Sequence, residues 1–465
     1  MRSRIGYWIA AVLLLSCATA ATGGTFSRAT FGRLAALPPE HALIMTGFPV
    51  GPSRSATVRF ERVEIYAPGT HLYVIGSAGK QEIPRSNLIF LRGYSDDGSV
   101  RVALALDPDG TFDSGSGEGP DGSFVLRSAV TVSGAVGLAA KSLESATPAG
   151  VNLNFTCGNE FENLDARGLN KLLSRATSPN AVVATAAASH VLRLATVAVD
   201  TDSAFMSNLF GNSTANATNW IAKMFNAMNT MYERDLLINL TQGTTILRNN
   251  AATDPYASGG AYPVINFPAD GVDLSNFGDN WAANETGVSR TFATLLSGKG
   301  PCPSGCSASG IAWVGSYCQT ASANGSYSVV MLFSNLSFDP NAAIAARLDG
   351  HELGHNFGAN HTHCTDLSTG NSPVATNTID QCYNGESGNG CYAGATSCPS
   401  SGPGAPAGTI MSYCNIKGCG GGQNVLQFHP TQINDVLLPD ISSTVANQPG
   451  CLNASDDIFY DGFEN

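Results

Sequence analysis

Four of the eight histidines in this 465-residue chain fall within thirteen consecutive residues, and the spacing of three of them constrains the local fold. His351 and His355 lie four residues apart and follow the helix-favouring run NAAIAARL at 341–348. On an α-helix this spacing places both imidazoles on one face, one turn apart. Gly358 can take the left-handed conformation that ends a helix, so the chain can turn back and bring His361 to the same place. The pattern predicts a helix, a sharp reversal and three converging imidazoles.

Three converging neutral imidazoles are typical of a catalytic zinc site, in which a fourth position stays open to water. Zinc lowers the pKa of water to about 7, and the hydroxide can attack a polarised carbonyl carbon. Glu352 follows the first histidine, so its carboxylate can lie beside that water and accept its proton. A structural zinc site would instead close with a fourth protein ligand, usually Cys, and surface histidines would need no adjacent acid. The residues therefore favour hydrolysis of amide bonds without a covalent intermediate.

The complete pattern, HELGHNFGANH at 351–361, resembles the zinc-binding motif of the metzincin metallopeptidases. Metzincins also carry a methionine turn beneath the zinc, and TIMSYC at 409–414 is similar to that turn, with Met411 as its methionine. With DQCY at 380–383, the context resembles the bacterial reprolysin-like (adamalysin-like, M12-type) secreted peptidases over about residues 190–450.

The resemblance implies a secreted endopeptidase that acts on proteins or peptides as a monomer. It implies one catalytic Zn²⁺ bound by His351, His355 and His361, with Glu352 as the general base. Calcium binding is also typical of the family, but the sequence assigns no ligands to it. Two alternatives stay open: a catalytically idle metzincin-fold module for binding or adhesion, and a pappalysin-like peptidase.

Three positions depart from the reprolysin-like pattern. Thr362 follows the third histidine, where adamalysins usually have Asp, and Met411 lies 60 residues after His351, which is farther than in that family. Tyr413, two residues after the methionine, is more like the astacin and serralysin pattern, in which the tyrosine can approach zinc and stabilise an oxyanion. Simple packing is the alternative role for Tyr413.

The fold class predicted for the chain is α/β, with a β-rich propeptide domain at 21–189 before a metzincin catalytic domain at 190–452. In the second region, apolar strands alternate with a helix whose Met and aromatic stripe has core spacing. The expected elements are strands at 191–199, 236–240, 310–318 and 327–333 and a helix at 219–232. The resemblance adds a twisted, mostly parallel sheet, with 310–318 as the edge strand along which an extended substrate lies.

The chain has twelve cysteines, which favour an oxidising compartment. Ten of them lie between Cys302 and Cys451, enough for five disulfides, and Cys302–Cys306 is one expected pair. The loop at 363–408 is rich in Gly, Ser, Asn and Pro and needs such crosslinks.

Cys17 lies in the predicted signal peptide, so Cys157 is left over in the mature chain, and it is followed by Gly158. In reprolysin and matrixin precursors a propeptide Cys often occupies the fourth zinc position, so Cys157 is a candidate cysteine switch. Cleavage at Arg167 or Arg175 would then release it. The alternative is a buried cysteine without a regulatory role.

The N-terminus indicates export. Residues 1–20 contain early arginines, an apolar run and an Ala-Thr-Ala end, which is typical of a cleaved signal peptide. Lipidation at Cys17 is a weaker alternative, because Leu15 fits a lipoprotein signal poorly. No later run is long enough to span a bilayer. The net charge of −12, without a dense Lys/Arg cluster, argues against nucleic acid as a partner. The acidic tail at 453–465 is either a sorting element or a terminus without function.

Overall fold

The structure, a computed structural model, describes residues 24–39, 41–130, 135–148, 151–158, 191–301, 306–320, 324–334, 339, 341–421 and 423–455. The predicted signal peptide, Arg167, Arg175, Cys302 and tail residues 456–465 lie outside the described residues. Among the helices of the described part, none is both long and apolar enough to cross a membrane.

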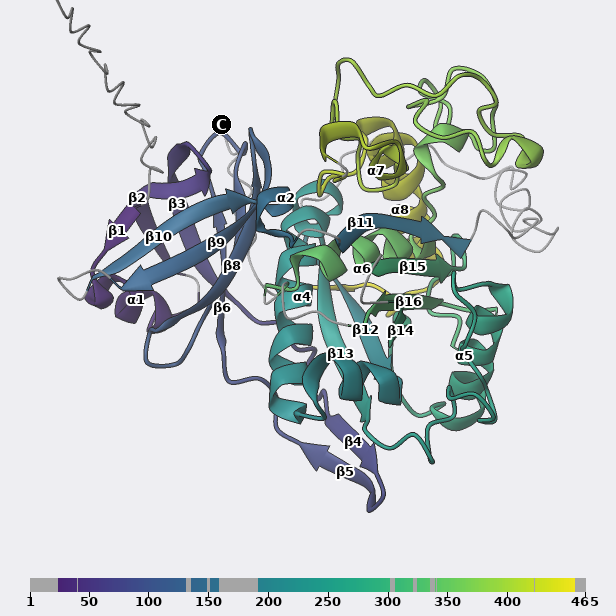
Figure 1. The fold of residues 1–465 in the computed structure, drawn as a ribbon, viewed down its shortest axis with the longest axis horizontal. Helices are drawn as coiled ribbons and strands as arrows, with labels where there is room; N and C mark the ends of the chain where they lie inside the picture. Colours follow the sequence, from purple (N-terminus) through teal and green to yellow (C-terminus); the bar gives the residue numbers. More distant parts are fainter. Residues whose placement is uncertain are drawn as a thin grey trace, which may run out of the picture.

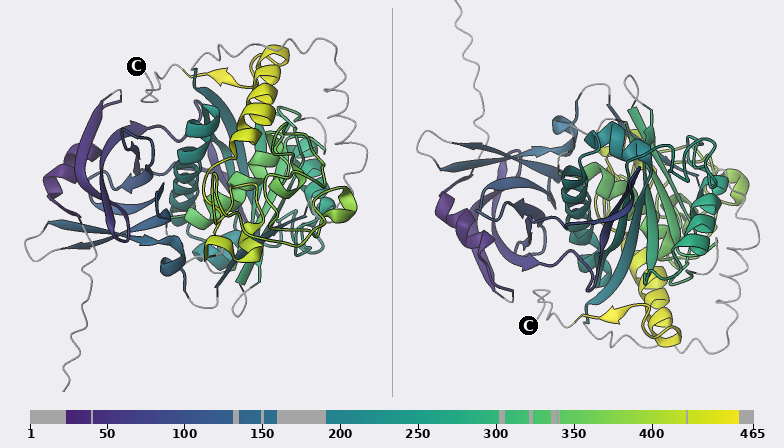
Figure 2. Two further views of the ribbon diagram at one scale, coloured as in Figure 1. Left: turned by 90° about the horizontal axis from the view of Figure 1, so that it is seen from above. Right: turned by 90° about the horizontal axis from the view of Figure 1, so that it is seen from below.

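The N-terminal residues form an antiparallel eight-stranded sheet, in agreement with the predicted β-rich region. Its spatial order is β1 (Gly24–Phe26), β10 (Val136–Ser142), β9 (Gly122–Val130), β8 (Phe112–Gly119), β7 (Arg101–Leu106), β6 (Ile89–Tyr94), β3 (Arg54–Val63) and β2 (Ala42–Gly51). Alternate residues such as Val58 and Phe60 are buried on one face, as expected for a half-buried strand. The sheet curls around this core, which α1 (Arg28–Ala35) helps to close through Phe31 (Figure 2).

The second sheet is mostly parallel and carries the remaining strands. Its spatial order is β11 (Val151–Cys157), β15 (Cys306–Ala312), β16 (Tyr327–Phe333), β14 (Phe292–Gly300), β12 (Arg193–Thr201), β13 (Ile238–Arg248), β4 (Leu72–Gly76) and β5 (Gly79–Ile83), and β17 (Asn453–Ala454) pairs with β12. The strands from β16 to β4 run parallel, whereas β15 is antiparallel to β16. This arrangement confirms the predicted α/β content.

Helices cover both faces of the second sheet (Figure 1). On one face lie α4 (Thr214–Leu236), with the predicted Met and aromatic stripe in the core, and α6 (Ala343–Asn356). On the other face lies α5 (Gly271–Asn284), which begins at a capping box between Asp270 and Asp273. The shorter α-helices are α2 (Leu143–Ala146), α7 (Cys414–Lys417) and α8 (Leu438–Asn447). Short 3₁₀ helices lie at Thr362–Cys364, Ser387–Asn389 and Cys419–Gly421. Short π-helices lie at Phe205–Leu209 and Gln432–Leu437.

The second sheet does not begin at residue 190. The β4–β5 hairpin leaves the N-terminal sheet between β3 and β6 and pairs with β13, while β11 pairs with β15 at the opposite end (Figure 1). Strands that precede residue 190 therefore border the later strands on both sides, an arrangement that short-range sequence patterns do not reveal.

The predicted strand at 310–318 is wrong in its C-terminal half, because β15 ends at Ala312. Gly315 then takes a positive φ of 63°, and the backbone N–H groups of Gly315 and Ser316 donate to the carbonyls of His355 and Asn356 at the end of α6. These hydrogen bonds satisfy carbonyl groups in the last turn of α6, and the chain leaves the sheet to form them. In this structure β15 is also not an edge strand, since β11 occupies its outer side.

Four disulfides join cysteines of the described residues: Cys318–Cys451, Cys364–Cys391, Cys382–Cys414 and Cys398–Cys419. Three of them crosslink the long loop predicted to need crosslinks. The expected Cys302–Cys306 pair stays a prediction, because Cys302 lies outside the described residues.

Candidate metal centre

Helix α6 carries the first two histidines and ends as the sequence predicts. All of its residues are buried, and His351 and His355 lie on the same face one turn apart. Gly358 has a φ of 108°, and the N–H of Ala359 donates to Gly354 O at 3.0 Å. This reversal returns the chain toward the helix and places His361 beside the other two rings.

The Nε2 atoms of the three histidines converge. The Nε2 of His355 lies 3.1 Å from that of His351 and 3.2 Å from that of His361. Nitrogens bound tetrahedrally to one zinc ion at about 2.0–2.1 Å lie roughly 3.3 Å apart. The three side chains are therefore already spaced as ligands of one ion.

The opposite ring nitrogens show that this convergence requires a cation. Each Nδ1 lies beside an oxygen acceptor: His351 beside Ile410 O at 2.7 Å, His355 beside Ala359 O at 2.8 Å, and His361 beside the Glu386 carboxylate at 3.0 Å. Because these oxygens only accept, each Nδ1 carries the proton and each Nε2 presents a lone pair. Three lone pairs at this distance repel one another unless a cation lies between them, so the residues fit a zinc ion.

His351 and His355 are also held in the neutral form that binds metal. Burial, together with the neighbouring His361, lowers the pKa of His351 to about 3. The pKa of His355 falls well below its ordinary value for the same reasons. Deprotonated imidazoles are thus the stable state of this interior at neutral pH.

Glu352 lies beside the converging rings. Its Oε2 accepts from Cys157 Sγ at 3.6 Å, and its Oε1 has no hydrogen-bond partner among the described residues. A Cβ at Gly310 of β15 would lie 2.2 Å from Oε1, so only glycine leaves room for this carboxylate. Burial raises the pKa of Glu352 well above its ordinary value, which makes the carboxylate a better proton acceptor.

The predicted methionine turn packs directly beneath the histidines. Met411 is fully buried, and a Cβ at Gly354 would lie 2.6 Å from its sulfur. Ile410 O accepts a hydrogen bond from His351 Nδ1, and Met411 O accepts one from the N–H of Thr362 at 3.1 Å. The methionine turn therefore holds in place both helix α6 and the chain that follows His361.

The departure at Thr362 is accounted for by a carboxylate from elsewhere in the chain. The Thr362 hydroxyl donates to Asp380 Oδ2 at 2.5 Å, and the Ser412 hydroxyl donates to the same oxygen at 2.7 Å. Asp380 thus links the third-histidine segment to the methionine turn. The crosslinked loop that delivers Asp380 also accounts for the long interval before Met411.

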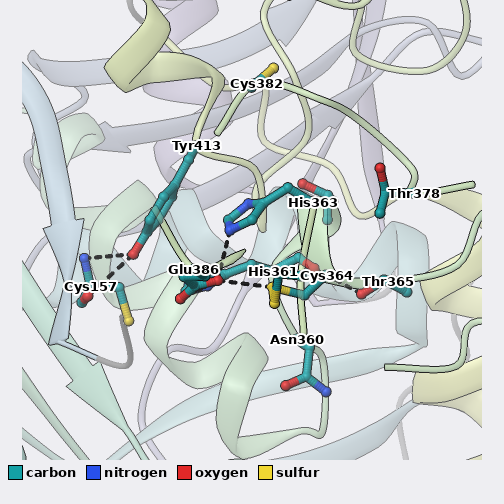
Figure 3. A network of polar contacts seen from close by, with 12 residues as sticks. Cys157, Asn360, His361, His363, Cys364, Thr365, Thr378, Cys382, Glu386 and Tyr413 are labelled. Atoms are coloured by element: carbon teal, nitrogen blue, oxygen red, sulfur yellow. Dashed lines mark hydrogen bonds and ion pairs between the residues drawn. A yellow bond between two sulfur atoms is a disulfide. The ribbon is translucent and has the colours of Figure 1, made fainter. Parts of the chain in front are cut away.

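Strand β11 brings Cys157 to the site. Its sulfur lies 3.6 Å from His355 Nε2 and joins the three histidines in a group of four potential ligand atoms within 4.8 Å of one another. The Tyr413 hydroxyl accepts from Cys157 N at 2.9 Å, and its oxygen lies 3.3 Å from Cys157 O (Figure 3). Both candidate residues therefore meet beside the histidines, and the Tyr413 hydroxyl contacts backbone atoms of Cys157.

Sequence analysis missed Glu386, which comes from the loop closed by Cys364–Cys391. Its carboxylate lies 3.0 Å from His361 Nδ1 and accepts from His363 Nε2 at 2.7 Å (Figure 3). Burial would raise its pKa, but His361 and His363 lower it below the ordinary value. His363 itself is fully buried. No local pattern around Glu386 identifies it, because a long loop sets its position.

A family match covers the part of the chain that carries this site. The family model for metallo-peptidase family M12 matches residues 191–428, just over half of the chain. None of the curated proteins compared with the chain matches it. The crystal structure of metalloproteinase-II from Bacteroides fragilis is similar at 10% sequence identity, over 72% of this chain and 86% of that chain, with a TM-score of 0.36. The chain belongs to metallo-peptidase family M12, and it is an enzyme of the zinc metalloendopeptidase class.

Proposed function

We propose that this chain is an exported endopeptidase that is made as a latent precursor and hydrolyses protein or peptide amide bonds. His351, His355 and His361 would hold the zinc ion, and Glu352 would be the general base. The observation that carries the proposal is the convergence of three Nε2 atoms next to a buried carboxylate. An idle binding module would have no use for the recess that Gly310 provides for Glu352.

Zinc at the three nitrogens would supply a Lewis acid that makes water acidic and polarises the scissile carbonyl. Glu352 takes the proton from the water as the carbon–oxygen bond forms, then delivers it to the departing amine nitrogen as the carbon–nitrogen bond breaks. The Tyr413 hydroxyl, once it no longer contacts Cys157, can donate to the developing oxyanion. During the reaction, hydrogen bonds to the methionine turn and to Glu386 keep the rings of His351 and His361 in place.

Latency is supported by the position of β11. Cys157 Sγ lies beside both His355 and Glu352, where the reacting water would need to be. The same strand pairs with β15 through Phe155–Cys157, the backbone that an extended substrate would use. Departure of the segment around Cys157 after proteolysis would free both the metal position and this strand edge.

Export is supported by the described disulfides, which persist in oxidising compartments. We propose that residues 1–20 are the signal peptide and that the enzyme acts outside the cell that makes it.

Replacing Glu352 with alanine is expected to lower kcat/KM of the processed enzyme by about 10²–10⁴-fold, because the proton acceptor is lost. Zinc content should stay at one ion per chain. The measurements are casein zymography with and without a zinc chelator, peptide hydrolysis rates and metal analysis. Asp279→Ala, at an exposed position on α5, serves as the control. Substantial activity in Glu352→Ala, or wild-type protein without zinc, would refute the assignment.

Glu386→Gln is expected to weaken zinc affinity by about 10–100-fold, because the amide cannot place a full negative charge behind His361. Competition with a chromogenic chelator measures this affinity directly. Glu82→Gln should bind zinc as the wild type does. Unchanged affinity in Glu386→Gln would show that the carboxylate only fills space.

Cys157→Ala is expected to give an uncut precursor that hydrolyses a short peptide faster than the uncut wild-type precursor, although β11 still covers β15. The reason is that alanine cannot occupy the metal position. Ser145→Ala, a surface change before β11, is the control. Equal activity of the wild-type and Cys157→Ala precursors would mean that the thiol does not impose latency.

A peptide inhibitor soaked into the processed enzyme is expected to pair with β15. The crystal structure of that complex should show backbone hydrogen bonds to residues 306–312. An inhibitor bound without any of these bonds would contradict the proposed substrate path.

A further inference from the structure

Residues 24–146, named here the N-terminal β domain, supply part of the sheet on which the metal centre is built. The β4 strand runs parallel to β13 from Leu72 opposite Thr245 to Ile75 opposite Arg248. Upstream of β4, the N–H of Gln242 donates to Ile65 O at 2.7 Å, and the N–H of Ala67 donates to Gln242 O at 3.0 Å. A continuous stretch of β13 therefore has its backbone groups satisfied by the N-terminal β domain.

The N-terminal β domain also neutralises two buried charges of residues 191–455, named here the peptidase unit. Arg347 lies on α6, one turn before the first zinc-binding histidine, and its guanidinium donates to Glu118 at 2.5 Å. Glu233 on α4 is paired with Arg92 of β6. All four side chains are less than one-tenth exposed. A buried charge that loses its partner is strongly destabilising.

Further polar groups of the peptidase unit find their partners across the same surface. The Asn226 amide on α4 donates to Leu104 O at 3.1 Å, Lys223 pairs with Asp113 at 3.0 Å, and Asn341 accepts from Gly115 N at 3.1 Å. Apolar residues from both parts form one core, and Figure 2 shows α4 lying directly between the curled sheet and the second sheet. This surface resembles a domain interior more than a temporary contact.

Strand β11 belongs to a different set of contacts. It lies at the opposite end of the sheet from β4, where it pairs with β15 and carries Cys157. Residues 147–150 separate it from α2, the last helix of the N-terminal β domain. Removing β11 would break none of the contacts of Glu118, Arg92 or β4.

We propose that the N-terminal β domain is a permanent subunit of the active enzyme and stays bound to the peptidase unit after processing. Only the segment around Cys157 leaves. The expected single propeptide at 21–189 thus divides into a retained scaffold and a removable inhibitor. The identity of the inhibitor rests on the proposed latency, whereas retention of the scaffold does not.

The test inserts recognition sites for one sequence-specific protease at residues 149–150 and within 159–190 of the full chain. After both cuts, native size-exclusion chromatography should show the N-terminal β domain eluting with the peptidase unit at a 1:1 ratio. Separate elution, with a peptidase unit that stays folded and binds zinc, would overturn the proposal. Peptide hydrolysis by the same sample reports on latency independently, so a failure of either idea is recognised separately.

A charge variant tests the physical reason. Glu118→Ala is expected to raise the dissociation constant of the doubly cut complex by about 100-fold or more, because Arg347 loses its partner. The matched control is Asp121→Ala in the adjacent turn, whose partner Arg54 lies in the same domain at 2.7 Å. Equal dissociation constants for the two variants would contradict the charge argument. If Glu118→Ala does not fold, co-elution of the cut wild-type protein still decides retention.

Discussion

Hydrogen bonds from the Nδ1 atoms of His351, His355 and His361 hold three Nε2 lone pairs close together, and the surrounding structure serves to provide their acceptors. One acceptor is the carbonyl before Met411, one is the carbonyl that follows the reversal at Gly358, and one is Glu386. Each comes from a separate segment. The metal centre consequently depends on the methionine turn, the helix ending and the crosslinked loop together.

The sheet that supports this centre is likewise assembled from distant parts of the chain. Strands from the N-terminal part of the chain border this sheet at both ends, and the two ends make different contacts. At one end, β4 joins the core and is accompanied by buried ion pairs. At the other end, β11 covers the strand edge and places a thiol beside the histidines. The proposed support and the proposed inhibition therefore lie at opposite ends of the sheet, although both come from residues that precede the peptidase unit.

The parts that sequence predicts are those set by local spacing. Helical periodicity identified α4, the four-residue interval identified the zinc-binding face of α6, and Gly358 identified its end. The approach of Cys157 was an expectation from resemblance, and the structure places its sulfur at the site. Glu386 and Asp380 could not be predicted, because disulfide-closed loops decide where they lie. The β4–β5 insertion escaped prediction for a related reason, since a short apolar strand does not indicate which sheet it joins. The turn at Gly315 depends on the end of α6, which is also distant in sequence.

Zinc X-ray absorption spectroscopy on the full-length precursor and on the processed enzyme tests the central claim most directly, because it counts the atoms bound to the ion. The account predicts three histidine nitrogens in both samples, with one sulfur at about 2.3 Å in the precursor and an oxygen in its place after processing. Fewer than three nitrogens in the processed enzyme would contradict the assignment of His351, His355 and His361. A precursor spectrum without sulfur would contradict the role given to Cys157.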